Sequence, residues 1–490
     1  MLYPFFQSKK MYKSVLLFIA IINLVFPLAG NANDKLYDYI VRWGKLKYIE
    51  NKRINYDDLL LSDYQKLKIG ETALLIDSYQ FNPGDKMICS PEHKPRVKGS
   101  LWNKRFEEDD KELIYNEAGR VLILAKYWNI IYYFYWNIDR HEWENVLSEF
   151  IPIFMKEQSL PEFKLNFLKL VARTHDNHAS YQCGGTSIGS GKKNIFFSYY
   201  DRVVQKDDSL FYKPDLKDLF LENVLKIKSI NGIEKNKYID SIGQINAYTH
   251  RSTLLRDVIV SACVTEKDSI VIQCENGSNI IYHPVAHINT PSSLLKNDSI
   301  LYINYGEFDH SDAKEVDKIF NQPHNIKYVF IDLRYGSGKF QYRTLEKNFV
   351  KKNIKYSFWQ EGFFYCNNTN TFQNEAYQKI KNVAGTYTGK IFILTNEVVQ
   401  SNTESLCMSL KTNPNTKLIG RSTAGANGNI AKVYLPFQLK SGFSYVKYSY
   451  ASGENYQGSG IKPDIEADIS GVNNIEDLEK IIIKFRLYDR

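Results

Sequence analysis

The sequence predicts a multidomain protein of mixed α and β structure, with a helical N-terminal module, a β domain and an α/β core. At 490 residues, the chain is too long for a single hydrophobic core. Between about 108 and 190, apolar residues recur three and four positions apart, which is typical of amphipathic helices. Between about 195 and 290 they alternate with a period of two, which is typical of strands.

The changes of period place the domain boundaries. We expect a mostly helical module over 33–190, a β domain over 191–292 and the core over 293–490. Trp128 and its neighbouring aromatic residues fall in the helical module. A helix–helix core explains them better than an aromatic ligand box does.

Residues 1–32 have the pattern of a signal peptide. Lys9, Lys10 and Lys13 precede an apolar run that Pro27 interrupts, and small residues follow, so we expect cleavage after about Ala32. The alternative is an uncleaved membrane anchor. No other stretch is long and apolar enough to cross a bilayer. The sequence therefore predicts export to a periplasmic or extracellular location.

Composition excludes some classes of protein and leaves others open. The formal charge of +8 is modest and Lys and Arg are scattered, which argues against a nucleic acid partner. Six cysteines occur without a CxxC pair, which argues against a zinc ribbon or a redox motif. An exported protein could form disulfides from them. Cys263 and Cys274 could pair, although we favour small buried residues at both positions.

The core sequence predicts one site at one edge of a sheet. After about 295, apolar strands alternate with amphipathic helices, which favours a parallel or mixed sheet covered on both faces. The loops "DLRYGSG", "NEVVQS" and "GRSTAGANGN" each follow a predicted strand. Ligands bind at the carboxyl ends of such strands, so these three loops should converge.

Four segments of the core, in this order and spacing, resemble the C-terminal processing (tail-specific) serine peptidases. They are "YVFIDLRYGSG" (328–338), "LTNEVVQSNTESL" (394–406), "KLIGRSTAGANGNI" (417–430) and "GENYQGSGIKPDI" (453–465). The resemblance implies a crotonase-like (ClpP/crotonase type) α/β core. A fifth segment, "LENVLKIKSINGIEKNKYIDSI", is similar to PDZ-type peptide-binding modules, which add an extended chain to a sheet edge.

The resemblance places the nucleophile at Ser401, three residues before Glu404. A serine at a strand-to-helix turn presents its hydroxyl to the crevice, and the helix start offers N–H groups to an oxyanion. We expect the N–H of Asn402 and that of Gly336 or Gly338 to form the oxyanion hole. The alternative is a capping box, in which Ser401 and Glu404 only cap a helix.

The general base differs from that of the better-known branch of the family, in which a Lys takes the proton. Ala426 stands at the Lys position, and Lys432 lies six residues further on. A second branch, which includes the tricorn core peptidase, uses a His from the upstream helical module. The segment "LKLVARTHDNHASYQC" matches that branch and makes His178 the base, with Asp176 two residues earlier. A metal site formed with His175 is the alternative.

The supporting acid that the same branch draws from upstream of the last motif would be Glu454, although a solvated turn residue is equally consistent with the pattern. Asp332, Arg334 and Asp464 fit structural roles. Together these features predict an exported serine endopeptidase that cleaves extended or unfolded chains through an acyl-enzyme, with no cofactor. The rivals are a catalytically silent peptide-binding module and, less favoured, a lipid or retinoid carrier.

Overall fold

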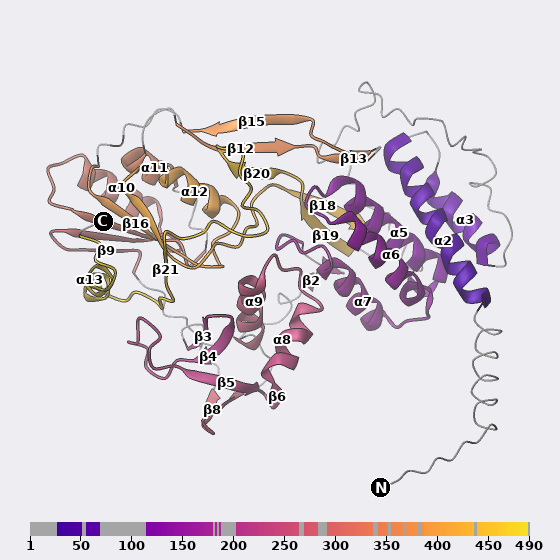
Figure 1. Ribbon diagram of the computed structural model, residues 1–490, viewed down its shortest axis with the longest axis horizontal. Helices are drawn as coiled ribbons and strands as arrows, with labels where there is room; N and C mark the ends of the chain where they lie inside the picture. Colours follow the sequence, from indigo (N-terminus) through magenta and orange to yellow (C-terminus); the bar gives the residue numbers. More distant parts are fainter. Residues whose placement is uncertain are drawn as a thin grey trace, which may run out of the picture. The chain divides into compact units, whose positions relative to one another are not determined.

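The structure is a computed structural model, and its element labels are those of Figure 1. The predicted signal peptide lies almost wholly outside the described residues, and α2 (Pro27–Lys45) begins five residues before the predicted cleavage site. The described residues are 27–50, 55–68, 114–179, 182–183, 186–187, 202–263, 269–282, 292–336, 342–350, 354–366, 368–380, 385, 387–435 and 439–488.

The chain divides into two compact units. The first comprises 1–95, 107–133 and 139–166, and its described part is helical. Its elements are α2, the π-helix η1 (Leu46–Glu50), α3 (Tyr56–Lys68), α6 (Arg140–Met155), most of α5 (Glu117–Phe134) and the start of α7 (Leu160–Ala172).

Aromatic residues fill the core of this helical unit. Trp128 and Trp143 are almost fully buried, and each indole N–H donates to the backbone carbonyl of the other residue. Tyr132 stacks on Trp128 with 4.8 Å between ring centroids. These contacts are those of a helix–helix core, as the spacing of the aromatic residues predicts.

The second unit contains a six-stranded sheet in the order β21-β17-β16-β11-β10-β9. All neighbouring strands are parallel except β9, which is antiparallel to β10. The strands are β9 (Leu294–Lys296), β10 (Ile300–Asn304), β11 (Tyr328–Asp332), β16 (Lys390–Thr395), β17 (Thr416–Gly420) and β21 (Ile465–Glu466). The prediction of a mixed, mainly parallel sheet in this part of the chain is confirmed.

Helices cover both faces of this sheet. Alternate strand residues pack on one face against α10 (His310–Phe320), α11 (Tyr342–Phe349) and α12 (Asn402–Leu410). The others pack on the opposite face against α13 (Ile475–Lys484). Figure 1 shows α10, α11 and α12 together on one side of β16 and α13 on the other. Because both faces are buried, β10, β11 and β16 are apolar over most of their length rather than alternating.

A β domain precedes this sheet within the same unit, and we use that name for residues 202–282. Its strands are β3 (Val203–Lys206), β4 (Ser209–Tyr212), β5 (Leu225–Ile230), β6 (Ile233–Glu234), β7 (Ile270–Cys274) and β8 (Asn279–Tyr282). They pair in the order β3-β4-β5-β7-β8, all antiparallel, with β6 beside β5. In this path β3 is an edge strand.

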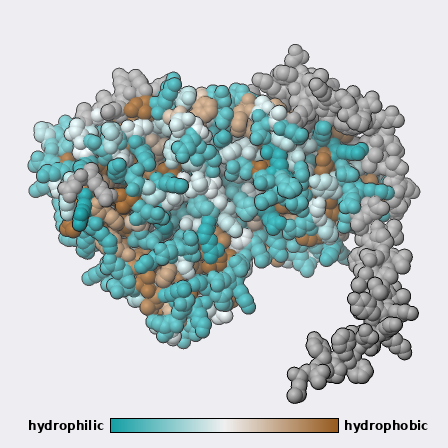
Figure 2. Space-filling view, viewed as in Figure 1, coloured by the Kyte–Doolittle hydropathy of each residue, from teal (hydrophilic) through white to brown (hydrophobic). Residues whose placement is uncertain are grey.

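Two helices, α8 (Lys235–Gly243) and α9 (Arg251–Cys263), complete the hydrophobic core of the β domain. The domain also exposes large apolar side chains, and Figure 2 shows hydrophobic residues gathered over its part of the molecule. Those exposed by 38% or more are Leu216, Ile233, Val260, Val271 and Ile281. The predicted mixed α and β architecture is therefore present, while the PDZ-like and crotonase-like assignments stay predictions.

Two smaller sheets adjoin the core. One has the order β18-β19-β1-β2, formed by β18 (Ile430–Leu435), β19 (Leu439–Ser444), β1 (Gln182–Cys183) and β2 (Thr186–Ser187). The other has the order β15-β12-β20, formed by β15 (Asn374–Lys379), β12 (Lys355–Glu361) and β20 (Lys447–Tyr450). A two-stranded hairpin pairs β13 (Phe364–Cys366) with β14 (Thr369–Thr371). Among the helices described, none has the length and apolarity needed to cross a membrane.

Candidate active site

Ser401 occupies a strained turn between β16 and α12. Its backbone has φ 59° and ψ −130°, a combination that non-glycine residues rarely adopt. It stands at the N-cap position of α12, yet its side chain makes no capping hydrogen bond. The capping-box alternative is therefore wrong for Ser401. A serine held in an unfavourable conformation without a structural bond for its hydroxyl is typical of a nucleophile elbow.

Glu404 joins the start of α12 to residues 423–428, which we call the glycine loop. Its carboxylate accepts from Thr423 Oγ1 at 2.5 Å and from the Gly425 N–H at 2.9 Å. Gly425 has φ +66°, and a Cβ there would lie 2.5 Å from the Gly460 amide nitrogen, so only glycine fits. Burial is the main influence on Glu404 and raises the pKa of its carboxyl to about 7.

The predicted oxyanion donors are only partly described. Asn402 is the first residue of α12, where a helix has N–H groups without intrahelical acceptors. Gly336 has φ +92° and follows β11, and its N–H lies 3.4 Å from the Leu333 carbonyl, a long contact. Gly338 lies outside the described residues. The place of Asn402 at the helix start suits an oxyanion donor, whereas the Gly336 N–H is directed at the Leu333 carbonyl, so the oxyanion hole stays a prediction.

His178 lies after α7 and is 7% exposed. Its Nδ1 lies 2.8 Å from Ser444 Oγ at the end of β19. Asp176 accepts from the His178 N–H at 2.9 Å, from Ser444 Oγ at 3.1 Å and from the Ser444 N–H at 2.5 Å. Desolvation lowers the pKa of His178 and outweighs the opposing effect of the Asp176 charge. The imidazole is therefore neutral near pH 7.

These bonds determine which nitrogen of His178 carries the proton. An ionised carboxylate only accepts, so the Ser444 hydroxyl donates its single proton to Asp176. Ser444 Oγ then accepts from the Nδ1–H of His178. This leaves Nε2 with a lone pair, as a general base requires.

Hydrogen bonds link Ser401 directly, and the neighbour of His178 through Thr249, to the glycine loop. The Ser401 N–H donates to the Ala426 carbonyl at 2.8 Å. On the other side, the Thr249 N–H donates to Asn177 Oδ1 at 3.0 Å, and the Thr249 hydroxyl donates to the Ala424 carbonyl at 2.6 Å. Ser401 and the residue before His178 are thus both connected to one loop.

The two candidate catalytic side chains are not hydrogen-bonded to each other in this structure. Among the described residues, neither Ser401 Oγ nor His178 Nε2 has a hydrogen-bond partner. In enzymes without substrate, such catalytic contacts are often long and tighten only when substrate binds. The pairing of Ser401 with His178 therefore stays a prediction that the shared loop supports.

Glu454 lies apart from the buried bonds around His178. It is exposed in the turn after β20, where its N–H donates to Ser452 Oγ at 3.4 Å. Gln457 is buried instead, and its side-chain oxygen accepts from the Tyr448 N–H at 2.5 Å. The structure thus places Asp176, and not Glu454, behind His178.

The residues assigned structural roles do make structural contacts. Arg334 pairs with Asp332 at 2.7 Å and donates to the carbonyls of Ile469 and Ser470. Asp464 accepts from the Leu418 N–H at 2.8 Å. Sequence reasoning missed Ser444, because a serine within a predicted strand carries no signal until the register places it beside another loop.

His175 does not join the base. Its backbone has φ 51°, and its ring packs edge-on against Tyr248 with 5.7 Å between centroids. No group of three or more potential metal ligands occurs among the residues that the structure describes.

Residues 299–467 match the model of peptidase family S41. No curated protein sequence matches the chain. A crystal structure of a serine-to-alanine mutant of CPAF is similar, with TM-score 0.51, 10% identity, and coverage of 75% of this chain and 94% of that one.

Two further solved structures are similar. The photosystem II D1 C-terminal processing protease matches with TM-score 0.43 and 13% identity. The match covers 71% of this chain and 92% of the protease chain. The tricorn protease matches with TM-score 0.36 and 13% identity. The match covers 77% of this chain and 37% of the tricorn chain. The matched segment contains Ser401, Glu404 and the glycine loop. Residues 299–467 of this chain are thus a peptidase family S41 domain.

Proposed function

We propose that the protein is a serine endopeptidase in which Ser401 is the nucleophile and His178 the general base. The observation that carries the proposal is the strained backbone of Ser401 at the start of α12, with a hydroxyl that caps nothing. Strain of this kind costs roughly 1–3 kcal/mol and persists only where the surrounding structure enforces it. Here the Ala426 carbonyl and the Glu404 bonds to the glycine loop enforce it.

In the proposed reaction, Ser401 Oγ attacks the carbonyl carbon of a peptide bond while its proton passes to His178 Nε2. The Asn402 and Gly336 amides stabilise the negative oxygen that forms. His178 then gives the proton to the amine as the C–N bond breaks, and an acyl-enzyme remains. Water hydrolyses it by the same steps, which returns Ser401 and neutral His178.

Ser444 and Asp176 act as positioning residues in this proposal. They contact no substrate, but they hold the His178 ring and its tautomer through the bonds at 2.8 and 3.1 Å. They replace Glu454 as the support of the base. The role of the acid in other serine hydrolases is the same: it orients the imidazole and stabilises the imidazolium.

An extended or unfolded chain is the proposed substrate. In the antiparallel ladder of the β domain, the Lys213 N–H donates to the Arg202 carbonyl, so the backbone groups of Val203 and Gln205 point away from β4. An edge strand with outward N–H and C=O groups can pair with a further extended segment. The substrate would then run from β3 towards Ser401.

A disulfide outside the site supports the proposal that the protein is exported. Cys366 is disulfide-bonded, while Cys274 and Cys407 are buried free thiols. Disulfides form and persist in oxidising compartments. We therefore propose that the signal-like N-terminus directs the chain to the periplasm or the outside of the cell.

Labelling with a fluorophosphonate probe tests the proposal. The probe forms a covalent adduct with an activated serine, so the unmodified protein should be labelled and should cleave casein. Ser401→Ala should lose both reactions and keep its thermal unfolding midpoint. Ser405→Ala is the matched control, because it lies one helical turn away and should retain labelling. Equal labelling of Ser401→Ala would show that the nucleophile lies elsewhere.

A catalytically silent peptide-binding protein is the second candidate, because Ala426 replaces the Lys of the better-known branch and Ser401 has no hydrogen bond to a base. An unmodified protein that binds casein without labelling or cleavage at any pH would establish that candidate instead.

A further inference from the structure

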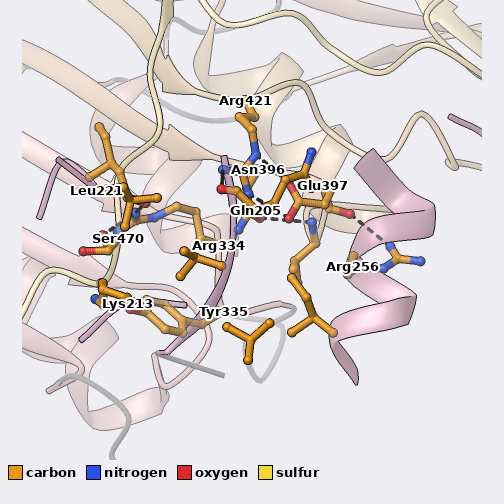
Figure 3. A pocket seen from close by; sticks show the side chains of 16 residues that line it. Gln205, Lys213, Leu221, Arg256, Arg334, Tyr335, Asn396, Glu397, Arg421 and Ser470 are labelled. Carbon is orange, nitrogen blue, oxygen red and sulfur yellow. Dashed lines mark hydrogen bonds and ion pairs between the residues drawn. The ribbon is translucent and has the colours of Figure 1, made fainter. Parts of the chain in front are cut away.

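A cleft of about 100 Å³ lies between the β domain and the parallel sheet, and its charged side chains pair with one another. Figure 3 shows Arg334, Glu397 and Arg421 around it. Arg421 pairs with Glu397 at 2.9 Å and with Asp468 at 2.8 Å. Arg334 pairs with Asp332 at 2.7 Å. A charged ligand would have to break these pairs before it could bind, so the cleft does not favour one.

The outer edge of β15, by contrast, is exposed along nearly its whole length. β15 is an edge strand of the sheet β15-β12-β20, and Figure 1 shows β12 between it and β20. All residues of β15 except Gln378 are exposed, and Tyr377 exposes 41% of its surface. A strand with one neighbour leaves a row of backbone N–H and C=O groups without a ladder partner, which can pair with another strand.

The other sheet edges in the described part of the chain are shorter or more buried than β15. Strands β3, β8 and β20 have four residues each, and β2, β9, β13, β14 and β21 have three or fewer. Strand β18 has six residues, as β15 does, but every second one is buried. Short or covered edges are the usual protection against pairing between molecules, and β15 has neither feature.

Two charged side chains on β15 make no ion pair among the residues that the structure describes. Glu375 and Lys379 lie two residues to either side of Tyr377, so all three side chains point to the same face of the sheet. The Glu375 carboxylate accepts one hydrogen bond, from Gln360 Nε2 at 3.1 Å. Opposite charges are therefore placed symmetrically about one exposed aromatic residue.

This symmetry makes β15 complementary to itself. If a second copy adds antiparallel about a two-fold axis at Tyr377, each Glu375 lies opposite the Lys379 of the other copy. Tyr377 then lies opposite its own counterpart, and the Phe358 ring, 5.0 Å from that of Tyr377, extends the row of rings. Within β15, no other two-fold register sets Glu375 opposite a lysine. Cross-strand pairs of opposite charges and of aromatic rings both stabilise a sheet.

We propose that the outer edge of β15 pairs with the same edge of a second copy of this chain, in the register centred on Tyr377. The pairing joins two three-stranded sheets into one of six strands, with β20 at both ends. A two-fold interface uses the same surface on both copies, so the assembly closes at two. Stable interfaces have about 20–30 residues a side, so this smaller one should give a dimer that dissociates on dilution. The dimer does not depend on the role of Ser401.

A disulfide across the two-fold axis tests the register. Cα atoms of directly opposite residues in antiparallel strands lie about 4.5 or 5.5 Å apart, and a disulfide can span both separations. Tyr377→Cys should therefore give a covalent dimer on mild oxidation. Lys379→Cys is the matched control, because its two copies lie about 13 Å apart along the strands. It should cross-link no more than the unmodified protein, which measures the background from the native cysteines.

Charge reversal tests the complementarity, with the dimer dissociation constant measured by sedimentation equilibrium. Lys379→Glu sets like charges opposite each other at both ends of the interface, so it should raise the constant roughly 10-fold or more. Adding Glu375→Lys restores opposite charges and should return the constant close to that of the unmodified protein. Lys314→Glu is the matched control, since it makes the same change of charge at an exposed position on α10 and should have no effect.

A protein that stays monomeric at every concentration tested, with no cross-linking through Tyr377→Cys, would overturn the proposal. A dimer that Lys379→Glu leaves intact, or preferential cross-linking through Lys379→Cys, would also overturn it, because another surface or register would then be used. Casein binding to a monomeric protein that Lys379→Glu weakens would assign the edge to a substrate segment instead. Loss of fluorophosphonate labelling in a protein that still dimerises would refute the role of Ser401 and leave the β15 interface standing.

Discussion

The loop that carries Ser401 and the loop that carries His178 are stabilised in opposite ways. Ser401 has a backbone at φ 59° and a hydroxyl without a capping bond. His178 is held by its neighbour Asp176 and by Ser444, which is 266 residues away in the sequence. The proposed nucleophile thus has a strained backbone and a hydroxyl without a capping bond, whereas the proposed base is buried and firmly bonded.

This difference shows where each residue's chemistry comes from. In the proposed mechanism, the reactivity of Ser401 depends on a turn that α12 and the glycine loop impose on it. In the same mechanism, the basicity of His178 depends on which nitrogen Ser444 leaves unprotonated. A change near Ser401 should therefore act through geometry, and a change near His178 through protonation.

The largest expected effect is that of His178→Ala. Loss of the base should lower kcat for casein cleavage by about 10³-fold or more, because proton transfer from Ser401 then has no acceptor. His175→Ala is the control and should cost far less, since its ring only packs against Tyr248. The reverse order of effects would make His175 the base.

The pH dependence sharpens the same comparison. Burial lowers the pKa of His178 below its ordinary 6.5, so the rate should rise with pH and level off below neutrality. The lowered pKa also means that the folded state binds fewer protons than the unfolded chain. Its contribution to stability is present above pH 6.5 and is lost as the pH falls towards the folded pKa. A rate that still rises towards pH 10 would implicate a Lys such as Lys432.

The sequence predicted the strand-to-helix turn at Ser401 and its place at the sheet edge, but not the contacts that hold His178. Ser401 follows from a local pattern, a β-branched strand, a polar turn and a helix, within motifs of fixed order. Ser444 lies near His178 where β19 pairs with β1, the strand that follows His178, in the register that sets Lys440 opposite Gln182. Long-range register is invisible in a single sequence. The prediction of Glu454 relied on the family resemblance alone. Nothing in the sequence around it indicates which acid lies beside His178.

The next largest effect should come from the bonds behind His178. Ser444→Ala and Asp176→Asn should each lower kcat, roughly 10–100-fold, and leave KM nearly unchanged, because neither residue touches substrate. A purely structural loss would lower the thermal midpoint and labelling together without moving the pH profile. We expect the pH profile to shift, and Ser444→Thr, which keeps the hydroxyl, to restore most of the activity.

A smaller effect, on stability rather than rate, is expected for Glu404. Burial raises the pKa of this carboxyl from 4.5 to about 7, so the folded state holds a proton that the unfolded chain releases. Its stabilising contribution is complete below pH 4.5 and is lost as the pH rises through about 7. Glu404→Gln removes the charge, so it should flatten the decline in unfolding free energy over that range by at most roughly 3 kcal/mol. Denaturant unfolding at pH 5 and pH 8 measures this decline in unfolding free energy for both proteins. If the decline in the variant equals that of the unmodified protein, another titrating group causes it.

The smallest effect is expected for Glu454→Gln. The side chain is exposed in a turn, whereas the bonds that fix His178 come from Asp176 and Ser444. An exposed carboxylate is screened by solvent and can orient a buried imidazole only through direct contact. We therefore expect kcat within about twofold of the unmodified protein and an unchanged pH profile. A loss as large as that of Asp176→Asn would mean that substrate binding brings the turn after β20 against His178. In that case the resemblance would have identified the supporting acid correctly, and Asp176 would only shape the loop.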